Sequence, residues 1–358
     1  MKQFLFHFSI IYTILLSLYS CDNSNHINII PRNCSAIIEA DAKTFNLPFK
    51  GIDSTKKVYY FEIADGTLGL CAAIDDEYQL DEYLHQLQKT NKTDNFTESE
   101  GIQFCTYSNT WILGYDDKRL LLLGPIIPAE YTRTTKRIIK LLHQDEEKSI
   151  VKAELWTHLH ECIKNDNKEV CMAILASALP EQLTAAFTIG APRGTAAEDI
   201  IIESSINIAD SCMILKGHTC SYNMNIKQEL HKAQKLYHKL TFDWQNIISD
   251  SSLVSIFMNI NGNDYIPYIQ RNKSLNSLLL GTNAYEEMKS ANGNVVIEIN
   301  PGNHDNYTAK IQKFPNGNYT GEERLVVSLD VQNLFNKKTG NIIPLPDNVR
   351  RIVYYLDE

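Results

Sequence analysis

Motifs that identify the common catalytic and nucleotide-binding folds are missing from this 358-residue chain. It contains no G-x-S-x-G, the turn that presents the nucleophile of α/β-hydrolases, and no Walker or G-x-G-x-x-G loop for phosphates. It contains no C-x-x-C pair either. The sequence therefore gives no sign of the enzyme classes that these motifs mark.

An excess of positive charge is also missing. The chain has 34 Lys and Arg against 43 Asp and Glu, and losing Lys2 with residues 1–20 leaves 33 against 43, a net charge of −10. This balance disfavours nucleic-acid binding, and no polybasic membrane patch is present. A hydrophobic content of 44% and a charged content of 22% are typical of a folded globular body.

The N-terminus is the most informative segment. Lys2 precedes a predominantly apolar run of 15 residues, Phe4 to Leu18, which is short for a membrane span and typical of a signal peptide. Leu18-Tyr19-Ser20-Cys21 follows and resembles a bacterial lipobox, in which the cysteine receives acyl chains and the peptide before it is removed. We predict a signal peptide over 1–20, lipidation of Cys21 and a flexible tether over 21–28. An ordinary secretory signal with a chance cysteine is the alternative.

Seven cysteines remain after Cys21, an odd number that leaves at least one thiol unpaired within a single chain. Several lie in apolar runs such as "LGLCAAI" and "VCMAIL", which favours small buried side chains over ligands. The alternative is that two of these cysteines form a disulfide in an oxidising periplasm. Cys212 and Cys220 cannot bridge if they share one extended strand, because eight residues span about 27 Å.

Strand and helix patterns follow one another without a strict βαβ rhythm, which predicts an α+β fold of mostly antiparallel sheets faced by helices. Residues 34–45 and 252–265 each place an apolar strand before a polar turn, with a hairpin later in the chain. This echo predicts two related regions, 29–246 and 247–358, although such units also recur by chance.

The letters Gly302-Asn303-His304-Asp305 resemble a metallophosphoesterase ligand signature. That site also needs upstream D-x-H and G-D-x-x-D ligands to hold two cations, and neither is present. His304 is the last histidine of the chain. We expect a turn between two strands with an exposed histidine at its tip.

A second pattern resembles serine β-lactamases and penicillin-binding proteins. Ser149 and Lys152 form an S-x-x-K, Ser221 begins an S-x-N, and residues 338–340 read K-T-G. Only 18 residues follow Gly340, too few for the strands and helix that close that fold. Ser149 is more simply the N-cap of a helix over 149–164.

A third cluster contains His158, His160 and Cys162. On a strand these residues would share one face and could bind zinc, but the flanking apolar residues have helical spacing. A helix places His160 roughly opposite the other two. No metal or cofactor is therefore expected from this set.

Longer segments resemble a family of Bacteroidota envelope lipoproteins that carry a domain of unknown function. They include "IIPRNCSAIIEADAKTF", "YYFEIADGTLGLCAAIDDE" and "FMNINGNDYIPYIQRNKSLNSLLLG". The resemblance implies an envelope lipoprotein and supplies no catalytic residues. We expect attachment to the outer membrane. We expect a non-enzymatic protein that is held to the membrane by acyl chains on Cys21 and binds or scaffolds a protein or glycan. The alternative is a cell-envelope hydrolase that uses Ser149, Lys152 and Ser221, or His304.

Overall fold

The structure is a computed structural model of the chain. It describes residues 25–43, 47–94, 96–166, 170–179, 184, 187–209, 211–248, 252–272, 276, 283–301, 307–330 and 349–356. Cys21, the Gly302–Asp305 segment and the K-T-G at 338–340 lie outside these ranges.

One large sheet organises the protein. Its fifteen strands are β1 (Cys34–Asp41), β2 (Lys57–Ile63), β3 (Leu68–Ala73), β4 (Thr97–Ser99), β5 (Ile102–Tyr107), β6 (Trp111–Tyr115), β7 (Arg119–Gly124), β8 (Val170–Leu175), β9 (Ile201–Ala209), β10 (Cys212–Cys220), β11 (Val254–Asn261), β12 (Asn292–Pro301), β13 (Tyr307–Phe314), β14 (Leu325–Asp330) and β15 (Arg351–Leu356). Their order across the sheet is β13-β12-β11-β14-β15-β10-β9-β8-β1-β2-β3-β7-β6-β5-β4. Among the described strands only β10 and β15 pair in parallel. The predicted α+β fold with a mostly antiparallel sheet is confirmed.

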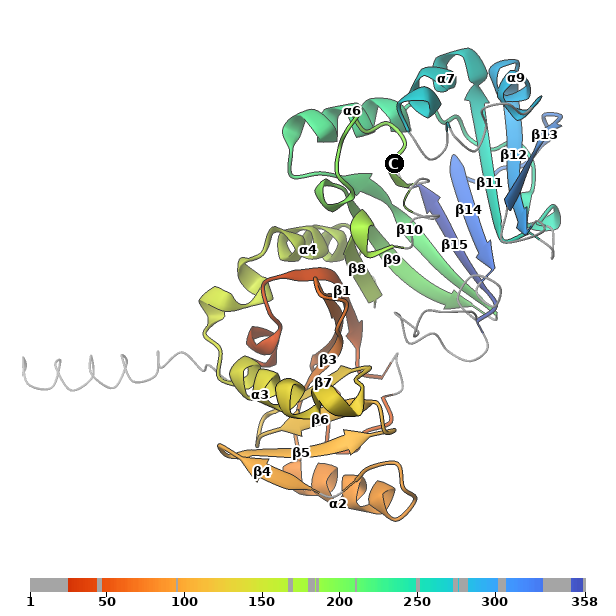
Figure 1. The fold of residues 1–358 in the computed structure, drawn as a ribbon. Coiled ribbons are helices and arrows are strands. Elements are labelled where there is room, and N and C mark those ends of the chain that lie inside the picture. The colour runs from red at the N-terminus through yellow and green to blue at the C-terminus, as the bar shows by residue number, and fades with distance from the viewer. Residues whose placement is uncertain are drawn as a thin grey trace, which may run out of the picture.

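Helices cover both faces of this sheet. They are α2 (Glu77–Gln88), α3 (Tyr131–Leu142), α4 (Glu154–Asp166), α6 (Met224–Gln234), α7 (Gly262–Arg271) and α9 (Asn283–Lys289). Figure 1 shows α6, α7 and α9 along one end of the sheet, α2 at the other, and α4 near the middle. None of the helices in the described ranges combines the length and hydrophobicity that crossing a bilayer requires.

Strand β8 shows how the two faces are separated. Cys171 and Ala173 pack in a cluster with residues of α3 and α4, whereas Met172 and Ile174 pack in a cluster with residues of α6 and α7. This alternation is the period-two pattern of a strand buried on both faces. The apolar run "VCMAIL" therefore suits the centre of the sheet, where helices lie above and below.

The predicted regions meet within this sheet. Residues 247–358 contribute β11 to β15, which lie consecutively, and β15 joins them to β10 of the preceding region. The division into 29–246 and 247–358 stays a prediction. At the N-terminus, His26–Ile29 form a short buried 3₁₀ helix, η1, so a tether would end before His26.

Two helices have boundaries that differ from their hydrophobic patterns. The helix predicted over 149–164 begins only at Glu154, after a separate 3₁₀ turn, η4 (Ile150–Lys152). Helix α6 ends at Gln234, although its apolar pattern continues to Tyr237 and Leu240. Both residues lie beyond the end of the helix and are buried. The hydrophobic spacing therefore indicates which residues are buried, but it does not show where the helix ends.

Candidate functional site

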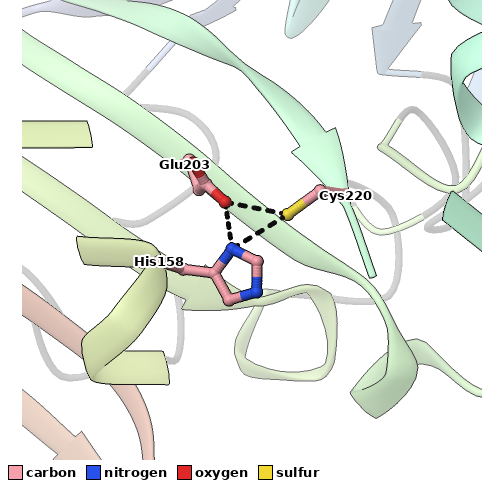
Figure 2. Close-up of side chains that lie close together, drawn as sticks. All are labelled: His158, Glu203 and Cys220. Carbon is pink, nitrogen blue, oxygen red and sulfur yellow. Dashed lines mark hydrogen bonds and ion pairs between the residues drawn. The ribbon is translucent and has the colours of Figure 1, made fainter. Parts of the chain in front are cut away.

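Three buried ionisable side chains meet where α4 crosses the sheet. His158 comes from α4, Glu203 from β9 and Cys220 from the end of β10, and their exposed fractions are 8%, 3% and 4%. One ligand atom of each lies within 4.8 Å of the other two. Figure 2 shows the imidazole, the carboxylate and the thiol pointing toward one common centre. We call these three residues the His-Glu-Cys cluster.

Strand pairing places two members of the cluster on the same face. Glu203 pairs directly with His218, and Cys220 pairs with Ile201, two residues before Glu203. Paired residues of neighbouring strands and residues two apart on one strand share a face. Glu203, Cys220 and His218 therefore all point toward α4 rather than toward α6.

The apolar stripe of α4 supplies the third member. Leu155, Leu159 and Cys162 bury this side of the helix against the sheet. His158 lies one turn from both Leu155 and Cys162, so the helical period directs its ring inward. The Tyr222 ring packs against it with the centroids 5.0 Å apart.

Hydrogen bonds join the cluster tightly. The Cys220 thiol donates to Oε1 of Glu203 at 2.9 Å, and Nδ1 of His158 is hydrogen-bonded to the same oxygen. Sγ of Cys220 lies 3.4 Å from Nδ1 of His158. On the outer side, Nε2 of His218 lies 3.6 Å from Oε2 of Glu203. The His218 side chain is 40% exposed, so it borders both Glu203 and solvent.

These contacts shift two pKa values in opposite directions. Burial raises the pKa of Glu203, but hydrogen bonds from His158 and Cys220 and the nearby His218 outweigh it, and the pKa falls below its ordinary 4.5. Burial, followed by the adjacent Glu203 carboxylate, raises the pKa of the Cys220 thiol well above its ordinary 9.0. Without a cation, the cluster is a carboxylate that accepts hydrogen bonds from a neutral thiol and an imidazole.

This geometry does not form a nucleophilic triad. A triad histidine uses one ring nitrogen for the nucleophile and the other for the acid that orients it. Here Glu203 and Cys220 both contact Nδ1 of His158. The raised pKa also keeps the buried thiol protonated, whereas nucleophilic cysteines need the thiolate. The arrangement can share protons or bind a cation, and both partners of the imidazole lie on the same ring nitrogen.

The residues of the serine-hydrolase alternative have separate partners. Ser149 is completely buried and stands at the N-cap position of η4. Its hydroxyl donates to the carbonyl of Glu146 at 2.7 Å and therefore makes no capping bond to the backbone of η4. Lys152 forms ion pairs with Glu146 and Glu147. Ser221 donates to the carbonyl of Asp199 at 2.5 Å. Among the described residues, no hydrogen bond or ion pair joins these three side chains.

The predicted helix at His158, His160 and Cys162 is confirmed. His160 points away from the cluster and its ring packs against Trp156, with the centroids 4.5 Å apart. Cys162 is buried on the side of His158. The turn expected at His304 lies outside the described residues, but the flanking strands β12 and β13 pair as expected, Pro301 with Tyr307.

Sequence reasoning missed Glu203 and Cys220. One signal was available: Glu203 interrupts the apolar run "DIIIESSINIA", and a carboxylate in a buried strand needs a partner. His218-Thr219-Cys220 also places two ligand-type side chains on one strand face. Neither signal identifies His158, which comes from a separate helix.

The seven cysteines in the described ranges are all thiols, and none forms a disulfide. Cys212 and Cys220 stand at opposite ends of β10, as their spacing requires. Cys212 is partly exposed and the other six are buried. Apart from Cys212 and from Cys220, whose Sγ faces Glu203, these thiols are therefore packed core side chains.

A second candidate site is an open hollow of about 530 Å³ beside the end of β13, the strand at one edge of the sheet. Its aromatic wall contains Phe242 and Phe314, whose rings stack with centroids 5.3 Å apart. Its polar wall contains Asn316, which accepts a hydrogen bond from Thr241. Ligand pockets of this size combine apolar walls with a few fixed polar groups.

Comparison with known proteins supplies a family and no activity. No curated protein matches the chain. One solved structure, crystal form IV of TP0453, is 11% identical to this chain and covers 52% of this chain and 76% of that chain, with a TM-score of 0.32. A likeness at this level carries no argument about function. A family described as "Domain of unknown function (DUF4836)" matches residues 45–310. Since that match spans most of the sequence and most of the sheet, the chain belongs to the DUF4836 family.

Proposed function

We propose that the protein is a non-enzymatic envelope lipoprotein, anchored by acyl chains on Cys21, whose folded body binds or scaffolds an envelope component. The observation that carries this proposal is the sequence Leu18–Cys21 directly after the apolar run of the N-terminus. Two or more acyl chains give stable membrane attachment, whereas one chain alone is marginal. We further propose that this envelope is that of a Bacteroidota bacterium, because the sequence resembles lipoproteins of that group.

An acylated Cys21 would hold the folded body near the membrane. The buried helix η1 begins at His26, five positions after Cys21. A chain of this length extends at most about 18 Å. The body would therefore lie close to the membrane surface, a position suited to assembling or holding envelope components.

A binding role is supported by the hollow around Phe242, Phe314 and Asn316. The separate partners of Ser149, Lys152 and Ser221 support the absence of an acyl-enzyme mechanism. No observation favours hydrolysis over binding.

Membrane fractionation tests the anchor. The native chain should partition into membranes and detergent, and it should incorporate an alkyne-labelled fatty acid in growing cells. Cys21→Ala should abolish the lipid label and release the protein from membranes. Ser24→Ala, three residues further on, is the matched control and should behave as wild type. Unchanged membrane retention of Cys21→Ala would refute lipid anchoring.

A further inference from the structure

The His-Glu-Cys cluster has the composition of a transition-metal site. Its potential ligands are an imidazole nitrogen, a carboxylate oxygen and a sulfur, on His158, Glu203 and Cys220. Zinc accepts all three ligand types, whereas Mg²⁺ and Ca²⁺ require oxygen ligands. The cluster lies in the folded body, so this inference is independent of the anchor at Cys21.

The spacing of the ligand atoms suits one small cation. Zinc bond lengths of about 2.0 to 2.3 Å place neighbouring ligand atoms of a tetrahedron roughly 3.4 Å apart. Sγ of Cys220 and Nδ1 of His158 are already separated by 3.4 Å. Oε1 of Glu203 lies closer than this to both Sγ, at 2.9 Å, and Nδ1 of His158, so the carboxylate would have to move outward to make room for the ion.

Charge also favours a divalent ion at this position. Burying an unpaired charge is unfavourable, so a buried site is best when its charges sum to zero. One carboxylate, one thiolate and a neutral imidazole carry two negative charges, which a divalent cation neutralises. A coordinating cation deprotonates a thiol outright, and the proton of Cys220 passes to solvent.

We propose that His158 Nδ1, Glu203 and Cys220 Sγ bind one Zn²⁺-type divalent cation, with a fourth coordination position that opens toward His218. The ion takes the place of the hydrogens that now join the three side chains. It ties α4 to β9 and β10, because each element contributes one ligand. The partly exposed His218 borders the cluster beside Oε2 of Glu203.

Direct metal binding tests the proposal. The full-length chain, purified in detergent and stripped with chelator, is dialysed against Zn²⁺ or Co²⁺, with Mg²⁺ as the contrasting ion. We expect one Zn²⁺ or Co²⁺ per chain and none of Mg²⁺. The Co²⁺ form should show a sulfur-to-cobalt charge-transfer band in the near ultraviolet, the signature of thiolate coordination.

Matched variants separate this cluster from other thiols and imidazoles. Cys220→Ser should lose the charge-transfer band, and Glu203→Gln should bind Zn²⁺ at least about tenfold more weakly. Cys162→Ser and His160→Gln, on the same helix as His158 but outside the cluster, should bind as wild type does. The wild-type cobalt spectrum decides the question even where a variant folds poorly. Absence of one bound Zn²⁺ per wild-type chain, or a band that persists in Cys220→Ser, would overturn the proposal.

Discussion

Sγ of Cys220 lies 2.9 Å from Oε1 of Glu203, although 17 residues separate the two along the chain. The β9–β10 hairpin makes this contact, because Cys220 sits diagonally across from Glu203 on the same face of the sheet. Helix α4 then covers the pair and adds His158. A carboxylate is thereby held inside the protein with each of its oxygens near a partner, which is the condition under which a buried charge is tolerated.

Removing this carboxylate should destabilise the metal-free protein. Glu203→Ala leaves the buried thiol of Cys220 and the imidazole of His158 without their shared acceptor. Each of these two stranded donors costs about 1–3 kcal/mol, so we expect a loss of roughly 2–6 kcal/mol in the free energy of unfolding. Urea denaturation with chelator present measures it.

Glu82→Ala, at an exposed position of α2, is the control for that experiment. Its free energy of unfolding should stay within about 0.5 kcal/mol of wild type. Equal stability of Glu203→Ala and Glu82→Ala would show that the cluster contributes nothing to the fold.

Stability should also fall in mild acid because of His26. Burial lowers the pKa of this histidine below its ordinary 6.5, against the opposing hydrogen bond between Nε2 and the carbonyl of Lys57. The unfolded chain then binds the proton more readily than the folded one, so stability is complete above pH 6.5 and is lost as the pH falls below it. The slope from this group is at most about 1.4 kcal/mol per pH unit.

Comparing wild type with His26→Gln isolates that contribution. The stability difference between them should shrink between pH 7 and pH 5, because only wild type acquires the buried charge. His143→Gln, at an exposed position, serves as the control. A difference that stays constant across this range would contradict the assignment to His26.

Close packing between β9 and β10 leads to another prediction. A Cβ added at Gly217 would lie 1.8 Å from the backbone oxygen of Glu203 and 2.6 Å from Oγ of Ser204. Gly217→Ala should therefore push the two strands apart and lower the free energy of unfolding by about 1–3 kcal/mol. It should also weaken Zn²⁺ binding, because these strands carry Glu203 and Cys220.

Gly66→Ala is the comparison for Gly217→Ala. Gly66 has φ +82° and no atom within 4 Å of an added Cβ, so only its backbone conformation resists the change. We expect a loss of about 1 kcal/mol with unchanged Zn²⁺ affinity. If Gly217→Ala leaves both stability and affinity at wild-type values, the close approach is not a constraint.

Local chemistry made much of the fold predictable. Asp65-Gly66 predicts the β2–β3 turn, and the Asp65 side chain accepts from the backbone N–H of Thr67 at 3.1 Å. Ser108-Asn109 marks the turn between β5 and β6, where the two residues adopt φ of 50° and 64°. These features depend on residues next to one another in the chain, so the sequence contains their causes.

Long-range features were not predictable in the same way. The parallel pairing of β10 with β15 joins segments more than 130 residues apart, as the hydrogen bond from Tyr354 to the carbonyl of Gly217, 137 residues away, illustrates. The His-Glu-Cys cluster also depends on contacts between distant segments, because His158 lies 45 residues from Glu203 and 62 from Cys220 along the chain. Hydrophobic periodicity gives the inward face of α4 but not which strand lies beneath it.

His218 provides the last prediction, which concerns zinc affinity rather than stability. Its Nε2 lies 3.6 Å from Oε2 of Glu203, the oxygen that does not face His158 and Cys220. A partner of this kind orients a ligating carboxylate without touching the metal, and losing one typically lowers affinity by about 10–100-fold. His218→Gln should therefore weaken Zn²⁺ binding to this extent in a competition titration, while the cobalt charge-transfer band persists because Cys220 still coordinates. His231→Gln, an exposed position on α6, should change neither quantity. Unchanged affinity in His218→Gln, or loss of the band together with binding, would contradict this orienting role.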